Sequence, residues 1–178
     1  MLVKTPRNII GLLVVKMIRN LYEMGPTLQK IMKRLQANQN LMKLLYYTDP
    51  DPLSQEDFTP AEVRDKIYEK LIKIVPRVGP HETATSVVSI RVESALRNRA
   101  NTEFNNITLK IEVFVPLTQW FIKDENLRPF AIMAEILNSL NGKVIDGIGR
   151  MEGGDFLLNF LTDEIAAFEM TFSFVQYD

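Results

Sequence analysis

The sequence predicts an α+β fold: a mostly antiparallel sheet with helices on one face, preceded by N-terminal helices. The first observation is that apolar residues recur at helical spacing over most of the N-terminal 71 residues. The second is that most later segments alternate apolar and polar residues, as antiparallel strands with one buried face do. The length of 178 residues, with 46% hydrophobic and 24% charged residues, suits one ordinary globular domain, or one domain with an arm.

Three helices are predicted in the N-terminal part. The first spans about residues 6–24, because Thr5-Pro6 supplies an N-cap followed by proline at the first helical position. It is apolar on two faces, so we expect one face to pack on something beyond its own sheet, and Gly25-Pro26 should end it. Its apolar run, residues 9–15, is too short to cross a membrane and lacks the cleavage site of a signal peptide. The second helix has its apolar stripe at Leu28, Ile31, Met32 and Leu35.

The third helix is short, has Asn38 as its cap, and ends at a double Asp-Pro stop over residues 49–52. Neither proline there can continue a helix. Thr59-Pro60-Ala61-Glu62 then forms a capping box, which predicts a helix from about residue 60 to about residue 71. At residues 71–75 the spacing of apolar residues changes from helical to every second residue, which predicts a short strand that Pro76 ends.

Strands are predicted around residues 88–92 and 107–115, joined by a polar, exposed hairpin tip at residues 97–106. A further helix follows and ends at Asn141-Gly142. Its buried stripe is predicted at Phe130, Met133, Ala134 and Leu137. Two more alternating segments, residues 156–160 and 168–174, close the chain as strands.

Charge is unevenly distributed along the chain. Residues 1–47 carry eight Lys or Arg and one Glu, a formal charge of +7, so the total of −1 leaves −8 for residues 48–178. The basic residues either decorate the solvent faces of helices or form an interaction arm. Nucleic-acid binding by such an arm is a further interpretation, which no motif of interleaved aromatic and basic residues supports.

The residue inventory argues against catalysis. The chain has no cysteine, which suits a reducing cytoplasm, and its one histidine, His81, lies in a turn. Gly147-Ile-Gly149 and Gly153-Gly154 precede a strand instead of opening a helix, so we expect them at turns and bulges and not around a phosphate. Asp49, Asp51, Glu56 and Asp57 lack the glycine and glutamate spacing of a calcium loop. We therefore expect no catalytic, cofactor-binding or metal-binding residues, and a protein that is not an enzyme.

Two features leave alternatives open. Glu135 is expected to pair either with Arg128, one to two turns earlier, or with a neighbouring subunit. The Trp120-Phe121 pair, just past a strand end, serves either as core packing or as an interface anchor, since Trp is over-represented among interface hot spots.

Three segments carry a resemblance to a known family. They are residues 41–53 with the double Asp-Pro stop, the alternating strand 105–120 that ends in Trp120, and residues 127–142 with Gly147-Ile-Gly149 behind them. They resemble small neck proteins of tailed bacteriophages, in particular the tail terminator or tail-completion family. The resemblance covers about residues 38–178 and divides the chain into an N-terminal helical arm, residues 1–37, and an α+β tail-terminator-like domain, residues 38–178.

This resemblance implies a structural protein of the virion neck that is assembled in the host cytoplasm. It implies a homo-hexameric ring that caps the tail tube, contacts the tail tube protein and the head connector or stopper protein, and leaves a channel for non-specific passage of double-stranded DNA. No membrane and no cofactor are implied. The acidic excess of residues 48–178 suits such a channel, because like charge weakens contact with phosphates. The alternative is a DNA-binding or regulatory factor that uses the basic N-terminal helices.

Overall fold

The computed structural model describes residues 22–75, 85–97 and 104–177. Its first part comprises a helix over residues 22–36, α2 (Gln39–Tyr46), the 3-10 turn η1 (Pro52–Ser54), and α3 (Pro60–Glu62), which continues as the π-helical turn η2 (Val63–Ile67). The main strands are β1 (Ile72–Ile74), β2 (Val87–Arg97), β3 (Phe104–Pro116), β8 (Glu152–Leu161) and β9 (Ile165–Tyr177). Between β3 and β8 lie the turn η4 (Leu117–Gln119), strands β4 (Phe121–Ile122) and β5 (Asn126–Leu127), helix α4 (Arg128–Leu140), and strands β6 (Val144–Ile145) and β7 (Gly149–Arg150).

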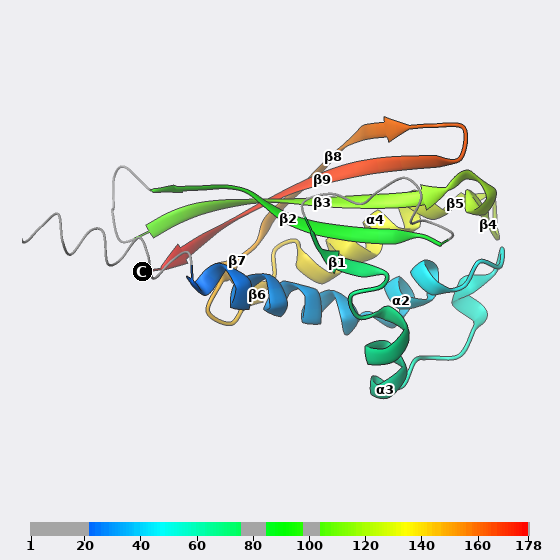
Figure 1. Ribbon diagram of the computed structural model, residues 1–178, viewed down its shortest axis with the longest axis horizontal. Coiled ribbons are helices and arrows are strands. Elements are labelled where there is room, and N and C mark those ends of the chain that lie inside the picture. The colour runs from blue at the N-terminus through cyan, green and yellow to red at the C-terminus, as the bar shows by residue number, and fades with distance from the viewer. Residues whose placement is uncertain (1–21, 76–84, 98–103, 178) are drawn as a thin grey trace, which may run out of the picture.

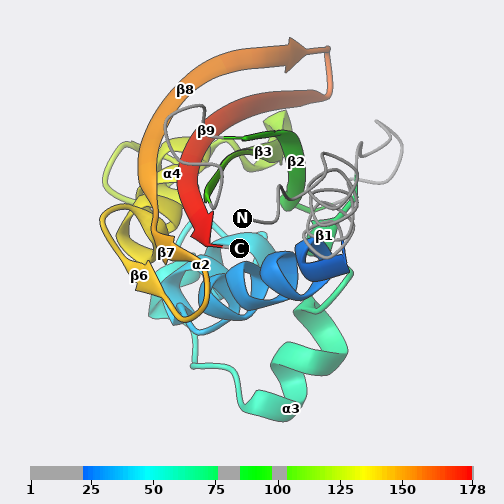
Figure 2. The ribbon, with the colours of Figure 1, turned by 90° about the vertical axis from the view of Figure 1, so that its left-hand side faces the viewer.

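The main strands form one sheet in the order β1-β2-β3-β9-β8. β1 runs parallel to β2 and the other neighbouring pairs are antiparallel, which confirms the predicted α+β class. Figure 1 shows the helices gathered on one side of the sheet, and Figure 2 shows that the sheet curves strongly, with β8 and β9 arching away from the helix over residues 22–36. The pairing of Arg97 with Asn105 confirms the hairpin between β2 and β3. Residue 97 and residues 104–106 of the predicted tip, 97–106, belong to these strands, and its residues 98–103 lie outside the described residues.

The core lies between the helices and one face of the sheet. Ile90, Ile111 and Met170 occupy neighbouring register positions on β2, β3 and β9 and are fully buried. The predicted apolar stripe of the second helix is buried against the same core, so residues 28–35 of the expected arm contribute to it. The Asn38 cap is confirmed, because its side chain accepts a hydrogen bond from the backbone N–H of Leu41 at 3.1 Å.

Two predicted helix boundaries are wrong. The helix over residues 22–36 runs through Gly25 and Pro26. Pro26 removes only the hydrogen bond to the carbonyl of residue 22, and burial of the apolar stripe that follows outweighs this loss. The capping box at residues 59–62 is confirmed, but its helix ends at Ile67 and not near residue 71. The chain turns there because Glu69 adopts a positive φ of 58°.

Helix α4 buries a different face from the one predicted. Phe130 and Ala134 are exposed and Leu137 is half-buried, so only Met133 of the predicted stripe is buried. The rotation of the helix is fixed at its first residue, because Arg128 is fully buried and other buried residues follow it at a spacing of four. These are Ile132, Ile136 and Leu140.

The strand predicted over residues 156–160 is confirmed as part of β8, but its alternating residues Phe156 and Leu158 are exposed. β8 is the last strand of the sheet and lies beyond the cover that the helices provide (Figure 1). Within the described ranges, no helix combines the length and apolar character needed to cross a membrane.

Candidate interaction surface

The edge strand β8 carries an apolar surface that the rest of the described chain does not cover. Phe156, Leu157 and Leu158 are 53%, 52% and 53% exposed, and Leu161 at the end of the strand is 61% exposed. Phe130 of α4, 40% exposed, adjoins them, because its ring centroid lies 6.0 Å from that of Phe156. Leu157 pairs with Glu169 and so points to the opposite face of the sheet, whereas Phe156, Leu158 and Leu161 share the face of Phe168. We call Phe130, Phe156, Leu158 and Leu161 the β8 apolar surface. Contiguous exposed apolar patches of this kind mark interaction sites.

Packing against a buried aromatic ring holds the two phenylalanines of this surface in place. Phe130 and Phe156 lie 5.6 Å and 6.3 Å from the buried ring of Phe168 on β9, measured between ring centroids. These tilted and edge-on arrangements are the favourable ones for aromatic rings. The exposed rings therefore extend the core outwards and are held in defined positions.

The backbone of β8 is poorly suited to receive another strand. The register with β9 shifts between Gly153 and Asp155 and again between Leu158 and Phe160. Such bulges twist an edge strand and interrupt its free hydrogen-bonding groups, which hinders pairing with a further strand. We therefore expect recognition at β8 to proceed through side-chain packing.

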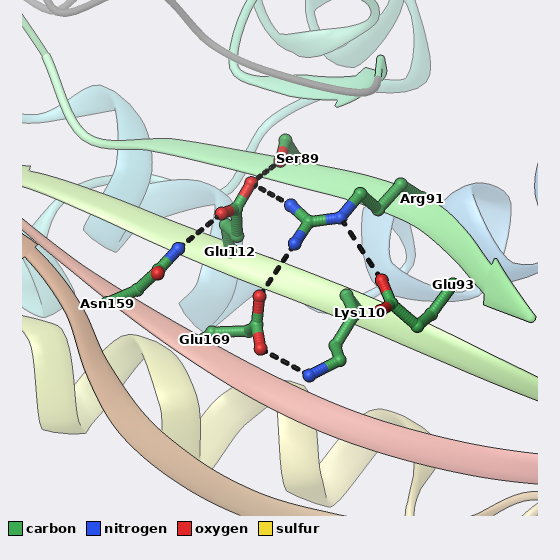
Figure 3. A network of polar contacts seen from close by, with 7 residues as sticks. All are labelled: Ser89, Arg91, Glu93, Lys110, Glu112, Asn159 and Glu169. Carbon is green, nitrogen blue, oxygen red and sulfur yellow. Dashed lines mark hydrogen bonds and ion pairs between the residues drawn. The ribbon is translucent and has the colours of Figure 1, made fainter.

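A polar network lies on the sheet face opposite the core (Figure 3). Arg91 on β2 contacts two carboxylates: its Nη1 lies 2.5 Å from Oε2 of Glu112, and its Nη2 lies 2.7 Å from Oε2 of Glu169. Lys110 contacts the other oxygen of Glu169. Asn159 of β8 donates a hydrogen bond of 2.6 Å to Oε1 of Glu112, which ties the edge strand to β3 across β9.

In this network the two carboxylates stabilise the charge of the partly buried Arg91. Burial alone would lower the pKa of Arg91, but the hydrogen bond and charge of Glu112, with the charge of Glu169, outweigh it and raise that pKa. Glu112 pairs with Arg91, and Glu169 pairs with both Arg91 and Lys110. The network consequently acts as structural cross-bracing between four strands.

Arg128 does not pair with Glu135, so that expectation is wrong. Its guanidinium instead donates to four backbone carbonyls, those of Leu44, Tyr47, Asp49 and Gln119, at 2.6–2.8 Å. Burial lowers the pKa of Arg128, but an arginine remains charged. The α2 end and the first Asp of the double Asp-Pro stop are thereby fixed to the start of α4.

Glu135 has other partners within its own chain. Its Oε2 accepts a hydrogen bond of 2.8 Å from Nδ2 of Asn38, so the residue that caps α2 also joins α2 to α4. The prediction that Glu135 contacts a neighbouring subunit stays a prediction.

Two of the loop carboxylates form ion pairs with lysine side chains of the same chain. Asp51 lies 2.9 Å from Nζ of Lys123, and Asp57 lies 2.7 Å from Nζ of Lys43. Over the described ranges no group of three or more His, Cys, Asp or Glu is placed to hold a metal ion. His81 lies outside those ranges.

The remaining candidates divide between core and surface. Trp120 is half-buried, 6.2 Å from the ring of Phe168, and packs against the core. Phe121 beside it is 72% exposed.

The glycines at 147, 149 and 153 have positive φ. They lie in the β6–β7 hairpin and at the first bulge of β8, which confirms their prediction as turn and bulge residues.

Sequence reasoning missed the β8 apolar surface. A signal for it exists: residues 156, 157, 158, 160 and 161 are all apolar, so both faces of this strand carry apolar side chains. A strand of this kind is either covered on both faces or leaves apolar side chains exposed. β8 is an edge strand, and the β8 residues named above are exposed.

The fold and this surface define a small α+β protein with an exposed apolar sheet edge. The chain belongs to the YomW family, whose sequence model matches residues 38–174. The family bears the name of YomW from a Bacillus prophage and is phage-related. A comparison with curated proteins found no match.

Proposed function

We propose that the protein is a structural ring protein of a phage virion neck, which caps the tail tube and joins it to the head connector or stopper protein. The observation that carries this proposal is the β8 apolar surface, on a protein of a phage-related family. Ring formation supplies a reason for that surface, because each subunit of a ring must contact its neighbours through two different, complementary patches. The resemblance to tail terminators suggests six subunits and a role without catalysis.

The charges support passage of DNA through such a ring without tight binding. Residues 48–178 hold 13 basic and 21 acidic side chains. Arg91 and Lys110, two of the basic residues on the sheet, are already paired with carboxylates. Affinity for duplex DNA depends on free Lys and Arg contacts with phosphates, so a domain of this composition should let DNA slide.

The mass of the full-length protein in solution tests the proposal. We expect native mass spectrometry to find a ring of defined stoichiometry, six by the resemblance. Leu158→Asp and Leu161→Asp should shift the population towards smaller species, because each places a charge in the β8 apolar surface. Val144→Asp is the matched control, since Val144 is 76% exposed on the separate β6–β7 hairpin and outside that surface.

Two results would contradict the proposal. One is a monomer at every accessible concentration, with no response to the β8 substitutions. The other is a salt-sensitive complex of the monomer with duplex DNA, which would support the DNA-binding alternative through the basic N-terminal residues.

A further inference from the structure

The N-terminal segment, residues 1–21, has two chemical properties that call for a partner surface. Its centre, residues 9–15, is almost entirely apolar. It also carries four basic residues, Lys4, Arg7, Lys16 and Arg19, and no acidic one. A matching surface must therefore be apolar in the middle and acidic around it.

The β8–β9 hairpin offers that combination. Residues 151–178 contain six Asp or Glu and no Lys or Arg. Asp163 and Glu164, both exposed, lie in the turn just after Leu161, at one end of the β8 apolar surface. Glu152 and Asp155 are exposed as well, but they pair with Ser173 and Thr171 and so lie on the other face of the same edge strand. An apolar surface on an acidic hairpin complements an apolar segment that carries only basic charges.

We propose that the β8 apolar surface binds residues 1–21 of a neighbouring copy of this chain, an inference that rests on the proposed ring. Each subunit would give its N-terminal segment to one neighbour and receive that of the other. This is a heterologous contact, which closes into a ring when the rotation between subunits is right. The two partners bury apolar area that neither covers alone.

The position of residue 22 suits a contact between subunits. In Figure 1 the first described turn of the helix over residues 22–36, drawn in dark blue, lies towards the opposite end of the long axis from the turn between β8 and β9. A segment of 21 residues spans about 30 Å as a helix and up to about 70 Å extended, enough to reach an adjacent subunit. The bulges of β8 favour packing of side chains over strand addition, and an apolar segment can dock in this way.

Cysteine cross-linking gives a direct test, because the chain has no cysteine of its own. Full-length Leu13→Cys and Leu158→Cys variants would be co-expressed with different tags and treated with a short bis-maleimide. We expect a covalent dimer that contains both tags, and a ladder of covalent oligomers from the double variant. Leu13→Cys with Val144→Cys is the control pair and should give little product.

The outcomes separate this inference from the ring itself. A cross-link confined to single chains in the double variant would overturn it, as would a yield no higher than that of the control pair. If native mass spectrometry of the same samples still finds rings, only the binding partner of β8 is wrong. If it finds monomers alone, the ring proposal fails as well.

A double-mutant cycle supplies a second readout. Deletion of residues 1–21 and Leu158→Asp should each weaken assembly by about 10-fold or more, as the loss of one apolar anchor does at an interface. If the two sites contact each other, the combined variant should be little weaker than the more severe single one. Effects that multiply would mean that the two sites act separately, and would overturn the inference.

Discussion

Glu112 on β3 lies directly opposite Glu169 on β9, although like charges in such positions repel. Both carboxylates are nearly buried, with 7% and 8% of their side chains exposed. Arg91 makes the arrangement stable because one guanidinium contacts both of them. The relationship makes Arg91 a focal point of sheet stability.

Replacing Arg91 with Met should reduce the free energy of unfolding by about 3 kcal/mol, because it leaves two buried carboxylates facing each other with one cation fewer. Urea denaturation of the purified variant measures this. Glu93→Gln is the control: Glu93 lies 3.9 Å from Nε of Arg91 and is half exposed, so the change should stay within about 0.5 kcal/mol. Equal effects of the two substitutions would show that the network contributes little.

Replacing Arg128 with Lys should destabilise the protein by about 3 kcal/mol even though the charge is kept, since an ammonium cannot reproduce the fork that reaches four carbonyls. The measurement is again urea denaturation. Arg64→Lys is the comparison, because Arg64 pairs only with its exposed neighbour Asp65 and should change stability by less than about 0.5 kcal/mol. A mild effect at Arg128 would contradict the clamp.

Glu62 should make stability depend on acid pH. The hydrogen bond from Lys66, then those from the backbone and hydroxyl of Thr59, lower the pKa of Glu62 from 4.5 to about 2. Since the folded pKa is the lower one, this stabilisation is present above pH 4.5 and is lost as pH falls towards 2. The melting-temperature difference between the protein and Glu62→Gln should shrink over that range. A constant difference would contradict the prediction.

Two glycine substitutions should differ in their cost. A Cβ at Gly153 would lie 2.4 Å from the backbone oxygen of Thr171, and φ is +132°, so Gly153→Ala should cost about 2 kcal/mol or more. Gly25 lies within a helix and a Cβ there would meet no atom beyond its chain neighbours within 4 Å, but Pro26 follows it and crowds a Cβ on a helical residue. This crowding offsets the usual gain of Gly→Ala in a helix, so Gly25→Ala should change stability by less than about 0.5 kcal/mol. Thermal unfolding compares the two, and equal costs would be the contrary result.

The fold was predictable where local pattern and burial agree. Strict alternation over residues 107–115 reports a strand with one covered face, and the structure has β3 there, with the predicted apolar side buried. Residues 156, 158 and 160 are apolar at alternate positions too, but the exposure of β8 depends on its place at the edge of the sheet. That place follows from the pairing of β9 with β3, two strands that are far apart in the sequence, and periodicity does not encode such a pairing.

The candidate site was less predictable for a related reason. The partners of Arg128 are backbone carbonyls, and every residue has one, so no side-chain type marks them in the sequence. The sequence instead offers the carboxylate of Glu135 as one possible partner, although in the structure Glu135 bonds Asn38. Likewise the face of α4 followed from the buried arginine and not from the apolar stripe alone.

The Arg128 clamp also bears on how this chain can diverge in evolution. A carbonyl oxygen survives any substitution of the residue that carries it, so the identities of Tyr47 and Asp49 can drift without loss of their bonds to the guanidinium. The arginine has no such freedom, because no other side chain presents the same set of donors. Related chains should thus vary around residues 47–49 and keep an arginine at the start of the long helix.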